Sequence, residues 1–328
     1  MEMKSEILRL LRETEGFLSG QQLCSRFQVS RTAVWKVIEQ LKEEGYAIEA
    51  VRNKGYRLAE SPDLISKAEL ESRIDTKWAG RDVIYFPKTD STNLRAKAAG
   101  EAGSPHGTLF VADQQTAGRG RRGRGWESPD GENVYMTLLL RPQISPDKAS
   151  MLTLVMALSA AEGLWQACQV QVEIKWPNDL VINGKKICGI LTEMNAEVDY
   201  IHYVVIGIGI NANQTEFPEE IKDTAASLKS ETGAQVFRAE MIARILERFE
   251  QNYEVFEKTE DLSGLQEAYN QRLVNRDRDV TVLDPAGTYH AHALGINEQG
   301  ELMVKTQEGE VRSIFAGEVS VRGVYGYV

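Results

Sequence analysis

The sequence has few cysteines, and the three it holds lie far apart. Cys24, Cys168 and Cys188 are odd in number and lack the paired spacing of a zinc ribbon, so we expect neither a disulfide framework nor a structural zinc site, and all three thiols reduced. No apolar stretch approaches the length that spans a bilayer, and the N-terminus begins a charged amphipathic pattern rather than a signal peptide. These absences predict a cytoplasmic protein.

Positive charge is scarce over the chain as a whole. The sequence holds 38 Lys and Arg against 48 Asp and Glu, a formal net charge of −10, which argues against a protein that coats nucleic acid everywhere. The balance is uneven, because residues 26–57 carry seven basic and four acidic side chains. A small basic surface is therefore expected near the N-terminus.

At 328 residues the chain is longer than one hydrophobic core usually organises, and its pattern changes twice. Residues 1–65 predict three helices and a hairpin, the pattern of a winged helix-turn-helix. Residues 66–272 predict strands mostly joined without helices, which favours a mixed or antiparallel sheet flanked by helices. Residues 273–328 predict short strands cut by turns, typical of a small SH3-like β-barrel. The expected fold class is α+β with three domains.

The central region contains seven strand-like runs and three helical ones. The strands are predicted at 82–86, 108–112, 134–140, 171–176, 180–182, 186–194 and 203–210, and the helices at 91–101, 146–166 and 238–256. Asn183-Gly184 is a strong hairpin signal. It predicts that a strand over 175–182 pairs with the strand over 186–194, with Asp179 and Lys186 on neighbouring backbone.

The winged-helix pattern carries the candidate DNA-binding residues. Ser19 and Gln22 predict a capping box at the second helix, and Ser30 caps the third, which runs from 31 to 44. On the face of the third helix opposite its apolar stripe, and on the hairpin wing, the expected contacts to base edges and phosphate are Arg31, Thr32, Trp35, Lys36, Arg52 and Lys54. Winged helices also serve as protein–protein modules, which remains the alternative.

Residues 118–126 form the densest candidate site, with four arginines and four glycines before Trp126. Glycines let the backbone approach a ligand and turn N–H groups toward an anion, while guanidinium groups bind carboxylate and phosphate with two parallel hydrogen bonds. An exposed basic loop or an Arg-Gly tail for nucleic acid is the alternative. The dinucleotide fingerprint is a poor match, since a strand rather than a helix should follow, and the chain lacks a Walker Gly-Lys-Ser/Thr.

Two further motifs follow this loop. Residues 175–179 read Lys-Trp-Pro-Asn-Asp, and Lys186 precedes a Gly-Ile-Leu run at 189–191. Residues 207–213 read Gly-Ile-Gly-Ile-Asn-Ala-Asn, which we interpret as a strand that ends in residues tolerant of unusual backbone angles. Taken singly, these motifs also fit a surface hairpin and an ordinary strand end.

Together the three motifs resemble those of biotin–protein ligases in order and spacing, and the flanking domains extend the resemblance over the whole chain to the class that also represses biotin operons. The resemblance implies a central domain like that of class II aminoacyl-tRNA synthetases. It implies a two-step reaction, in which the biotin carboxylate attacks the α-phosphate of ATP and a lysine of a biotin carboxyl carrier protein then takes up the biotinyl group. Mg²⁺ normally accompanies ATP in such reactions.

Matching the family motifs residue by residue implies the site. Lys186, Arg119 and Arg121 look catalytic, and the biotin contacts would be Ser91, Thr92, Asn93, Gln115, Arg119, Gly120, Arg121 and Lys186. The adenylate contacts would be Arg121, Arg124, Trp126, Asn211 and the 225–228 segment around Ala226. Asp179 would position the acceptor lysine or the metal. We expect no fixed protein metal site, because His290 and His292 have no further Cys or His near them in sequence.

Two alternative functions remain open, and the resemblance also implies binding partners. A lipoate-type ligase uses similar chemistry on a similar fold, and a transcription regulator whose large domain only senses a ligand is the other alternative. The resemblance implies operator DNA as a partner, with biotinyl-AMP as corepressor and a ligand-stabilised homodimer whose symmetry matches a two-fold operator. The glycine content of the loop at 118–126 predicts that it is mobile without ligand and orders over the acyl-adenylate.

Overall fold

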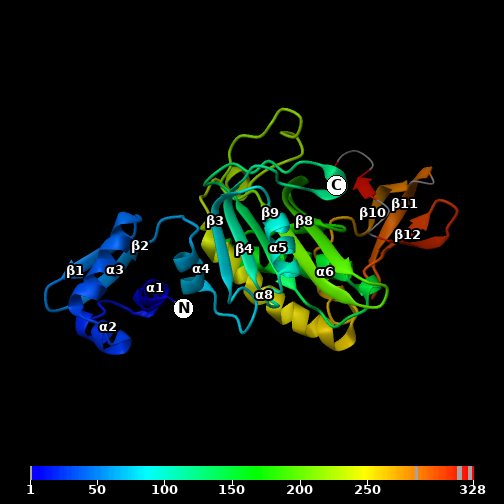
Figure 1. The fold of residues 1–328 in the computed structure, drawn as a ribbon. Helices are drawn as coiled ribbons and strands as arrows, with labels where there is room; N and C mark the ends of the chain where they lie inside the picture. The colour runs from blue at the N-terminus through cyan, green and yellow to red at the C-terminus, as the bar shows by residue number, and fades with distance from the viewer. Residues whose placement is uncertain (1, 285–286, 316–319, 324–326) are drawn as a thin grey trace. The chain divides into compact units, whose positions relative to one another are not determined.

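A computed structural model of the protein describes residues 2–284, 287–315, 320–323 and 327–328. The chain divides into two compact units, Met1–Ile74 and Asp75–Val328, and each is described by itself (Figure 1). The first compact unit extends past the predicted domain boundary at residue 65.

The first unit has the predicted helices and hairpin. Its elements are α1 (Met3–Glu13), α2 (Gly20–Phe27), α3 (Arg31–Glu43), β1 (Ala47–Val51), β2 (Gly55–Glu60) and α4 (Lys67–Arg73). The predicted capping box is present, because Ser19 and Gln22 cap each other's backbone N–H groups at the start of α2. Val34, Ile38 and Leu41 of α3 are buried in the core of this unit, as the apolar stripe predicts.

Helix α4 belongs to the first unit because an ion pair between Arg12 and Glu69 joins it to α1. Glu69 is 1% exposed, and its carboxylate accepts from Arg12 Nη2 at 2.6 Å and from Arg73 Nε at 2.6 Å. The hydroxyl of Tyr46 also donates to Glu69. Burial and, next, the charge of Glu69 raise the pKa of Tyr46, which keeps this phenol a donor.

The second unit is built on a seven-stranded sheet in the order β3-β4-β5-β9-β8-β7-β6. Its strands are β3 (Val83–Thr89), β4 (Leu109–Gln115), β5 (Val134–Leu140), β6 (Glu173–Lys175), β7 (Asp179–Ile182), β8 (Lys185–Ala196) and β9 (Ile201–Ile210). β3 and β4 are parallel and the other neighbours are antiparallel. The mixed sheet, with helices beside it, confirms the α+β class.

Helices cover both faces of this sheet. They are α5 (Thr92–Glu101), α6 (Met151–Cys168), α7 (Leu228–Thr232), α8 (Arg238–Thr259) and α9 (Gln266–Asn270), with short 3₁₀ turns at Arg121–Gly123 and Pro146–Lys148. Figure 1 shows α5 in front of the strands and α8 behind them. Ala96 of α5 packs with Tyr203 and Val205 of β9, so alternate residues of β9 face α5. Gly207 and Gly209 continue that row toward the site.

Helix α6 corrects one expectation drawn from the sequence. Residues Pro146–Cys168 are long and apolar enough, by length and composition, to cross a membrane. The helix is instead packed closely against α8, because a Cβ on Gly163 would lie 2.7 Å from the backbone of Ile245. Its apolarity is that of a core helix.

A five-stranded antiparallel sheet follows α9, in the order β13-β12-β11-β10-β14. Its strands are β10 (Arg278–Asp284), β11 (Gly287–Ile296), β12 (Leu302–Thr306), β13 (Val311–Ile314) and β14 (Ser320–Gly323). His290 and His292 of β11 contact Thr281 and Asp279 of β10. Over the described residues, no three His, Cys, Asp or Glu side chains gather as a metal site.

The predicted strand over 175–182 is wrong in one respect. β6 ends at Lys175 and β7 begins at Asp179, and the two pair with each other as an antiparallel hairpin. Pro177 lies in the turn between them, because it has no N–H to donate to a strand ladder. The predicted pairing across Asn183-Gly184 is confirmed by β7 and β8. The three cysteines are free thiols, as predicted.

Candidate active site

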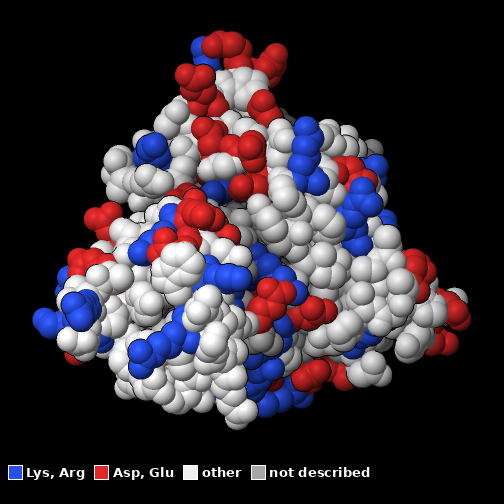
Figure 2. Space-filling model, turned by 60° about the vertical axis from the view of Figure 1, so that its left-hand side comes forward, with Lys and Arg blue, Asp and Glu red and all other residues white. Residues whose placement is uncertain are grey.

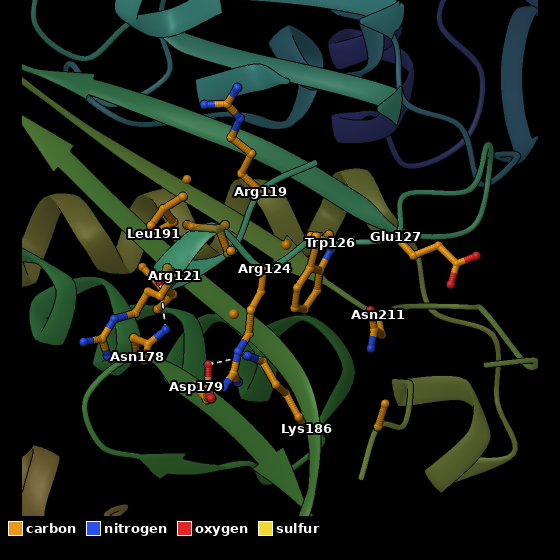
Figure 3. Close-up of a pocket in the computed structure, with 18 of the residues that line it drawn as sticks. Arg119, Arg121, Arg124, Trp126, Glu127, Asn178, Asp179, Lys186, Leu191 and Asn211 are labelled. Atoms are coloured by element: carbon orange, nitrogen blue, oxygen red, sulfur yellow. Dashed lines mark hydrogen bonds and ion pairs between the residues drawn. The ribbon is translucent and has the colours of Figure 1, made fainter. Parts of the chain in front are cut away.

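One cavity of about 320 Å³ in the second unit gathers most of the residues singled out by sequence (Figure 3). The predicted site residues that line it are Ser91, Thr92, Asn93, Gln115, Arg119, Gly120, Arg121, Arg124, Trp126, Asp179, Lys186 and Asn211. They come from α5, from the loop after β4, and from β7, β8 and the end of β9. The sheet therefore brings together segments more than 100 residues apart.

Polar groups at one end of the cavity hold each other in fixed orientations. The hydroxyl of Thr137, which is fully buried on β5, donates to Asn93 Oδ1 at 2.7 Å and lies 2.8 Å from the hydroxyl of Thr92. The backbone N–H of Thr92 donates to Gln115 Oε1 at 2.9 Å, and Gln115 Nε2 donates to Ser128 at 3.0 Å. This network preorganises hydrogen-bonding groups for a polar ligand.

Three glycines form the floor of the cavity. Gly189 of β8 pairs with Gly209 of β9, and a Cβ there would lie 2.9 Å and 2.6 Å, respectively, from atoms of the Trp126 ring. A Cβ on Gly207 would lie 2.0 Å from Asn93 Oδ1. None of the three has a positive φ, so these glycines serve close approach. The predicted strand end within 207–213 is confirmed, and the tolerance of these residues for unusual backbone angles is not used.

The arginine-rich loop folds back on itself beside this floor. Its backbone bonds join Gly120 N to Arg124 O at 2.8 Å and Trp126 N to Gly118 O at 3.0 Å. No helix comparable to that of a dinucleotide site follows, since the next regular strand is β5. Among the described residues, the buried indole N–H of Trp126 has no acceptor. The loop thus leaves a donor for a ligand to satisfy.

Cations and one carboxylate meet at the other end of the cavity. Lys186 Nζ lies 2.6 Å from Asp179 Oδ1 and 5.3 Å from the centre of the Trp126 ring. Arg121 donates to Asn178 Oδ1 at 2.9 Å, and burial lowers the pKa of the Arg121 guanidinium, against the opposing charge of Asp179. In Figure 3 Arg124 extends toward Asp179 and Lys186, whereas Arg119 and Glu127 point away from that pair. A partly desolvated cluster of cations suits an anionic ligand.

Ala226 is placed differently from the other predicted residues. It is 2% exposed and does not line the cavity, although its neighbour Ala225 does. The N–H of Ala226 donates to Lys186 O at 2.9 Å, and its carbonyl accepts from Asn211 Nδ2 at 3.0 Å. Ala226 therefore holds the backbone of Lys186 and the side chain of Asn211 without lining the cavity itself.

Comparison with known proteins agrees with this geometry. Residues 85–211 match the Biotin/lipoate A/B protein ligase family, residues 4–57 an HTH domain and residues 277–322 the biotin protein ligase C terminal domain. The chain is 42% identical to the bifunctional ligase/repressor BirA of Bacillus subtilis, over 93% of this chain and 94% of that protein. The chain belongs to the biotin protein ligase family.

Two more comparisons extend the likeness of the ligase to more distant proteins. The bifunctional ligase/repressor BirA of Escherichia coli is 32% identical over 97% of this chain and 96% of its own. The solved biotin protein ligase from Aquifex aeolicus, in complex with biotin and ATP, matches with a TM-score of 0.65 at 32% identity, covering 74% of this chain and 99% of that one. The family predicted from the motifs, and with it an enzyme of the ligase class, is confirmed.

The structure adds residues to the site that the sequence reasoning did not assign. Lys175 and Asn178 lie inside a quoted motif and line the cavity of the ligase, but their side chains had no predicted role. Tyr327 lines it too, from the end of the chain. Hydrophobic spacing could have indicated none of these contacts, because each depends on which segments the sheet brings together.

The predicted DNA-binding residues of the ligase lie on the surface of the first unit. Arg31, Thr32, Trp35, Lys36, Arg52 and Lys54 are all exposed. Trp35 is 52% exposed, so its ring is available to a partner. Figure 2 shows Lys and Arg interspersed with Asp and Glu on the face it views, without one continuous basic surface. The modest local charge seen in the sequence remains modest in the structure.

Proposed function

We propose that this ligase joins biotin to AMP using ATP and then transfers the biotinyl group to a lysine of a biotin carboxyl carrier protein. One observation carries the proposal: the Asp179–Lys186 pair lies in the same cavity as the arginine-rich loop and the Asn93–Gln115 network. A cavity with an oriented polar end and a cationic end suits a ligand that is neutral at one end and ionised at the other.

The first step needs charge neutralisation more than an enzyme nucleophile. A biotin carboxylate oxygen attacks the α-phosphorus of ATP, a new P–O bond forms, and the bond to the bridging oxygen breaks as pyrophosphate leaves. Both reactants are anions and repel each other. Lys186 bridges the carboxylate and the α-phosphate, while Arg121 balances the remaining charge, which is the largest contribution such a site can make. Arg119 points away from Lys186 in this structure, so its predicted catalytic role requires the loop at 118–126 to turn it toward the ligand.

The second step uses the same residues. The uncharged acceptor amine attacks the acyl carbon of the adenylate, the C–O bond to the phosphate breaks, and AMP leaves with the charge that Lys186 stabilises. The nitrogen loses one proton to solvent as the amide forms. Asp179 positions the incoming amine. The amide and hydroxyl groups of Ser91, Thr92, Asn93 and Gln115 hold the biotin ring, and Gly120 lets the loop backbone approach it.

In this proposal the adenylate lies against the Trp126 ring, which itself covers Gly189 and Gly209 of the floor. Trp126 offers a ring for stacking, and Arg121, Arg124 and Asn211 contact phosphate and nucleoside, with Ala226 fixing Asn211. Mg²⁺ usually binds one or two carboxylates together with substrate phosphates. The cavity supplies Asp179 and Glu127 as its carboxylates. Asp179 would hold the ion only by giving up Lys186, which lies 2.6 Å from its Oδ1, so in this proposal the ATP phosphates supply most of the ligands of the ion.

A transfer assay tests the ligase proposal. The protein is incubated with ATP, labelled biotin and a purified biotin-carrier domain, with labelled lipoate and a lipoyl domain in parallel. We expect label on the biotin carrier and little on the lipoyl domain. Transfer of lipoate alone would favour a lipoate-type ligase, and no transfer of either would leave a ligand-sensing regulator.

We also propose that the ligase represses genes of biotin synthesis and uptake, with biotinyl-AMP as corepressor and a homodimer as the DNA-binding form. The exposed row on α3 and the wing supports operator contacts, with α3 in the major groove. Measuring dimerisation and operator binding with and without biotin plus ATP tests this. Equal DNA affinity in both conditions would contradict the corepressor role.

The proposal also covers the domain bounds of the ligase, its location and the behaviour of its arginine-rich loop. We infer three domains: a winged-helix domain, predicted over 1–65 but extended to Ile74 by α4, a catalytic domain, predicted over 66–272, and an SH3-like barrel over 273–328. We also infer a catalytic domain resembling class II aminoacyl-tRNA synthetases and a cytoplasmic location. We also expect the loop at 118–126 to become protected on ligand binding. Unchanged limited proteolysis of this loop with and without biotin plus ATP would contradict that expectation.

A further inference from the structure

The end of the chain reaches the catalytic pair. The hydroxyl of Tyr327 donates to Asp179 Oδ2, across a sequence separation of 148 residues. The ring centre of Tyr327 lies 3.2 Å from Lys175 Nζ. Val328 lies against the β7–β8 turn, where a Cβ on Gly184 would be 3.2 Å from its side chain. The last two residues thus pack on the two strands that carry Asp179 and Lys186.

The two oxygens of Asp179 have different partners. Oδ1 pairs with Lys186 at 2.6 Å, and Oδ2 accepts from Tyr327. A carboxylate held at only one oxygen can rotate about its last torsion, which is broad and two-fold. A second donor on the other oxygen fixes that torsion. The hydroxyl of Tyr327 therefore restricts where Oδ1, and with it the Lys186 ammonium, can lie.

The ring of Tyr327 acts on a second cation. Lys175 is only 5% exposed and lines the same cavity. An ammonium placed against an aromatic face is attracted by the ring quadrupole, more strongly when water is excluded. One residue at the end of the chain thus contacts both the carboxylate and a buried ammonium of the Lys-Trp-Pro-Asn-Asp motif.

We propose that Tyr327 is a positioning residue for adenylate formation: its hydroxyl holds Asp179 in the orientation that directs Lys186 toward the reacting oxygens. This inference rests on the proposed function. It implies that Tyr327 completes the active site from a distant part of the sequence. A tyrosine that only filled space at the rim would act through its ring, and its hydroxyl would have no effect on the rate.

The test compares Tyr327→Phe with Tyr289→Phe, which removes a hydroxyl from β11 outside the cavity. The rate of adenylate formation is measured in a single turnover with labelled ATP, and biotin affinity by calorimetry. We expect Tyr327→Phe to lower the rate about tenfold, the loss typical of one hydrogen bond to a charged group, with unchanged biotin affinity and melting temperature. Tyr289→Phe should match the wild type.

A double-mutant cycle with Asp179→Asn tests whether Tyr327 acts through Asp179. In the Asp179→Asn protein, Tyr327→Phe should cause little further loss, because the carboxylate that the hydroxyl positions is gone. Full multiplication of the two losses would overturn the inference. So would a Tyr327→Phe protein as fast as the wild type.

Deletion of residues at the end of the chain tests the role of Tyr327 independently. Deleting Val328 alone should keep most of the rate, whereas deleting Tyr327 and Val328 together should lower it at least as far as Tyr327→Phe does. Equal rates after both deletions would contradict the inference. A wild type that forms no acyl-adenylate would instead contradict the proposed function, so the two failures are distinguishable.

Discussion

Glu69 and Asp179 are both carboxylates withdrawn from solvent, but their surroundings differ. Glu69 in the first unit is 1% exposed and accepts from two arginines and a tyrosine that come from neighbouring helices and a strand start. Asp179 lies in a cavity, keeps 14% of its side chain exposed, and pairs with one lysine and one distant tyrosine. The first arrangement is saturated and closed, and the second is open to a ligand.

This difference separates a structural carboxylate from a functional one. Removing one partner from a saturated buried cluster leaves an uncompensated charge and destabilises the fold. Removing one partner from a cavity leaves groups that water can solvate, so the fold tolerates the change while the chemistry does not.

The largest effect is expected for Lys186→Met. Loss of the ammonium removes the charge that bridges two anions, so the adenylation rate should fall by at least about 100-fold, while the melting temperature stays close to the wild type. Lys185→Met is the matched control, because Lys185 lies next to it outside the cavity and pairs loosely with Glu231 at 3.7 Å. Normal adenylation by the Lys186 variant would refute the catalytic role.

Glu69→Ala should show the opposite profile. Arg12 and Arg73 would lose their common anion in a buried place, so the first unit should lose about 3–5 kcal/mol of unfolding free energy. Adenylation by the second unit, which holds every residue lining the cavity, should be unchanged under conditions where both units are folded. Denaturant unfolding measures the loss, with exposed Glu60→Ala as control. A strong effect on adenylation would show that the contrast is wrong.

Gly209→Ala should weaken nucleotide binding with a smaller effect. The added Cβ would lie 2.6 Å from the Trp126 ring, so the indole must shift from the floor. Overpacking of this kind costs roughly 1–3 kcal/mol, which as a loss of ATP affinity corresponds to about 5-fold to 150-fold. In a Trp126→Ala protein the same glycine substitution should cost little more. An equal cost in both backgrounds would mean that the clash is elsewhere.

The smallest effect is expected for Lys54→Ala in the wing. A phosphate contact contributes affinity without sequence information, so the slope of log affinity against log salt should fall by about 1. Lys67→Ala, on α4 and away from the wing, is the control. DNA binding with an unchanged salt slope would remove Lys54 from the interface and favour the protein–protein alternative for this unit.

Local patterns predicted the winged helix well. The capping box at Ser19, the apolar stripe of α3 and the exposed row from Arg31 to Lys36 depend on neighbours within one or two turns. β5 was predicted with its observed bounds because every residue of Val134–Leu140 is buried. Strand ends that are set by Pro177 or by pairing with another strand differed from the predicted ends.

The site was predicted in part. Lys186, Asp179 and Arg121 carried a charge signature in motifs that could be quoted, and the structure brings them into one cavity. The close packing at Gly207 and Gly209 was not predicted, because only the tertiary structure places Asn93 and Trp126 over them. Thr137 and Tyr327 had no local signal at all.

Residues close together along the chain were enough to predict the longer helices, the strands of the central sheet, the charge of the loop at 118–126 and the family. The short helices α4, α7 and α9 had no such signal. The tertiary structure decided which side chains meet. The second oxygen of Asp179 has a hydrogen-bond partner because Tyr327, 148 residues away in sequence, lies beside it. Trp126 lies on the floor of the cavity because two neighbouring strands place glycines side by side. Such contacts depend on long-range packing, which no short pattern records.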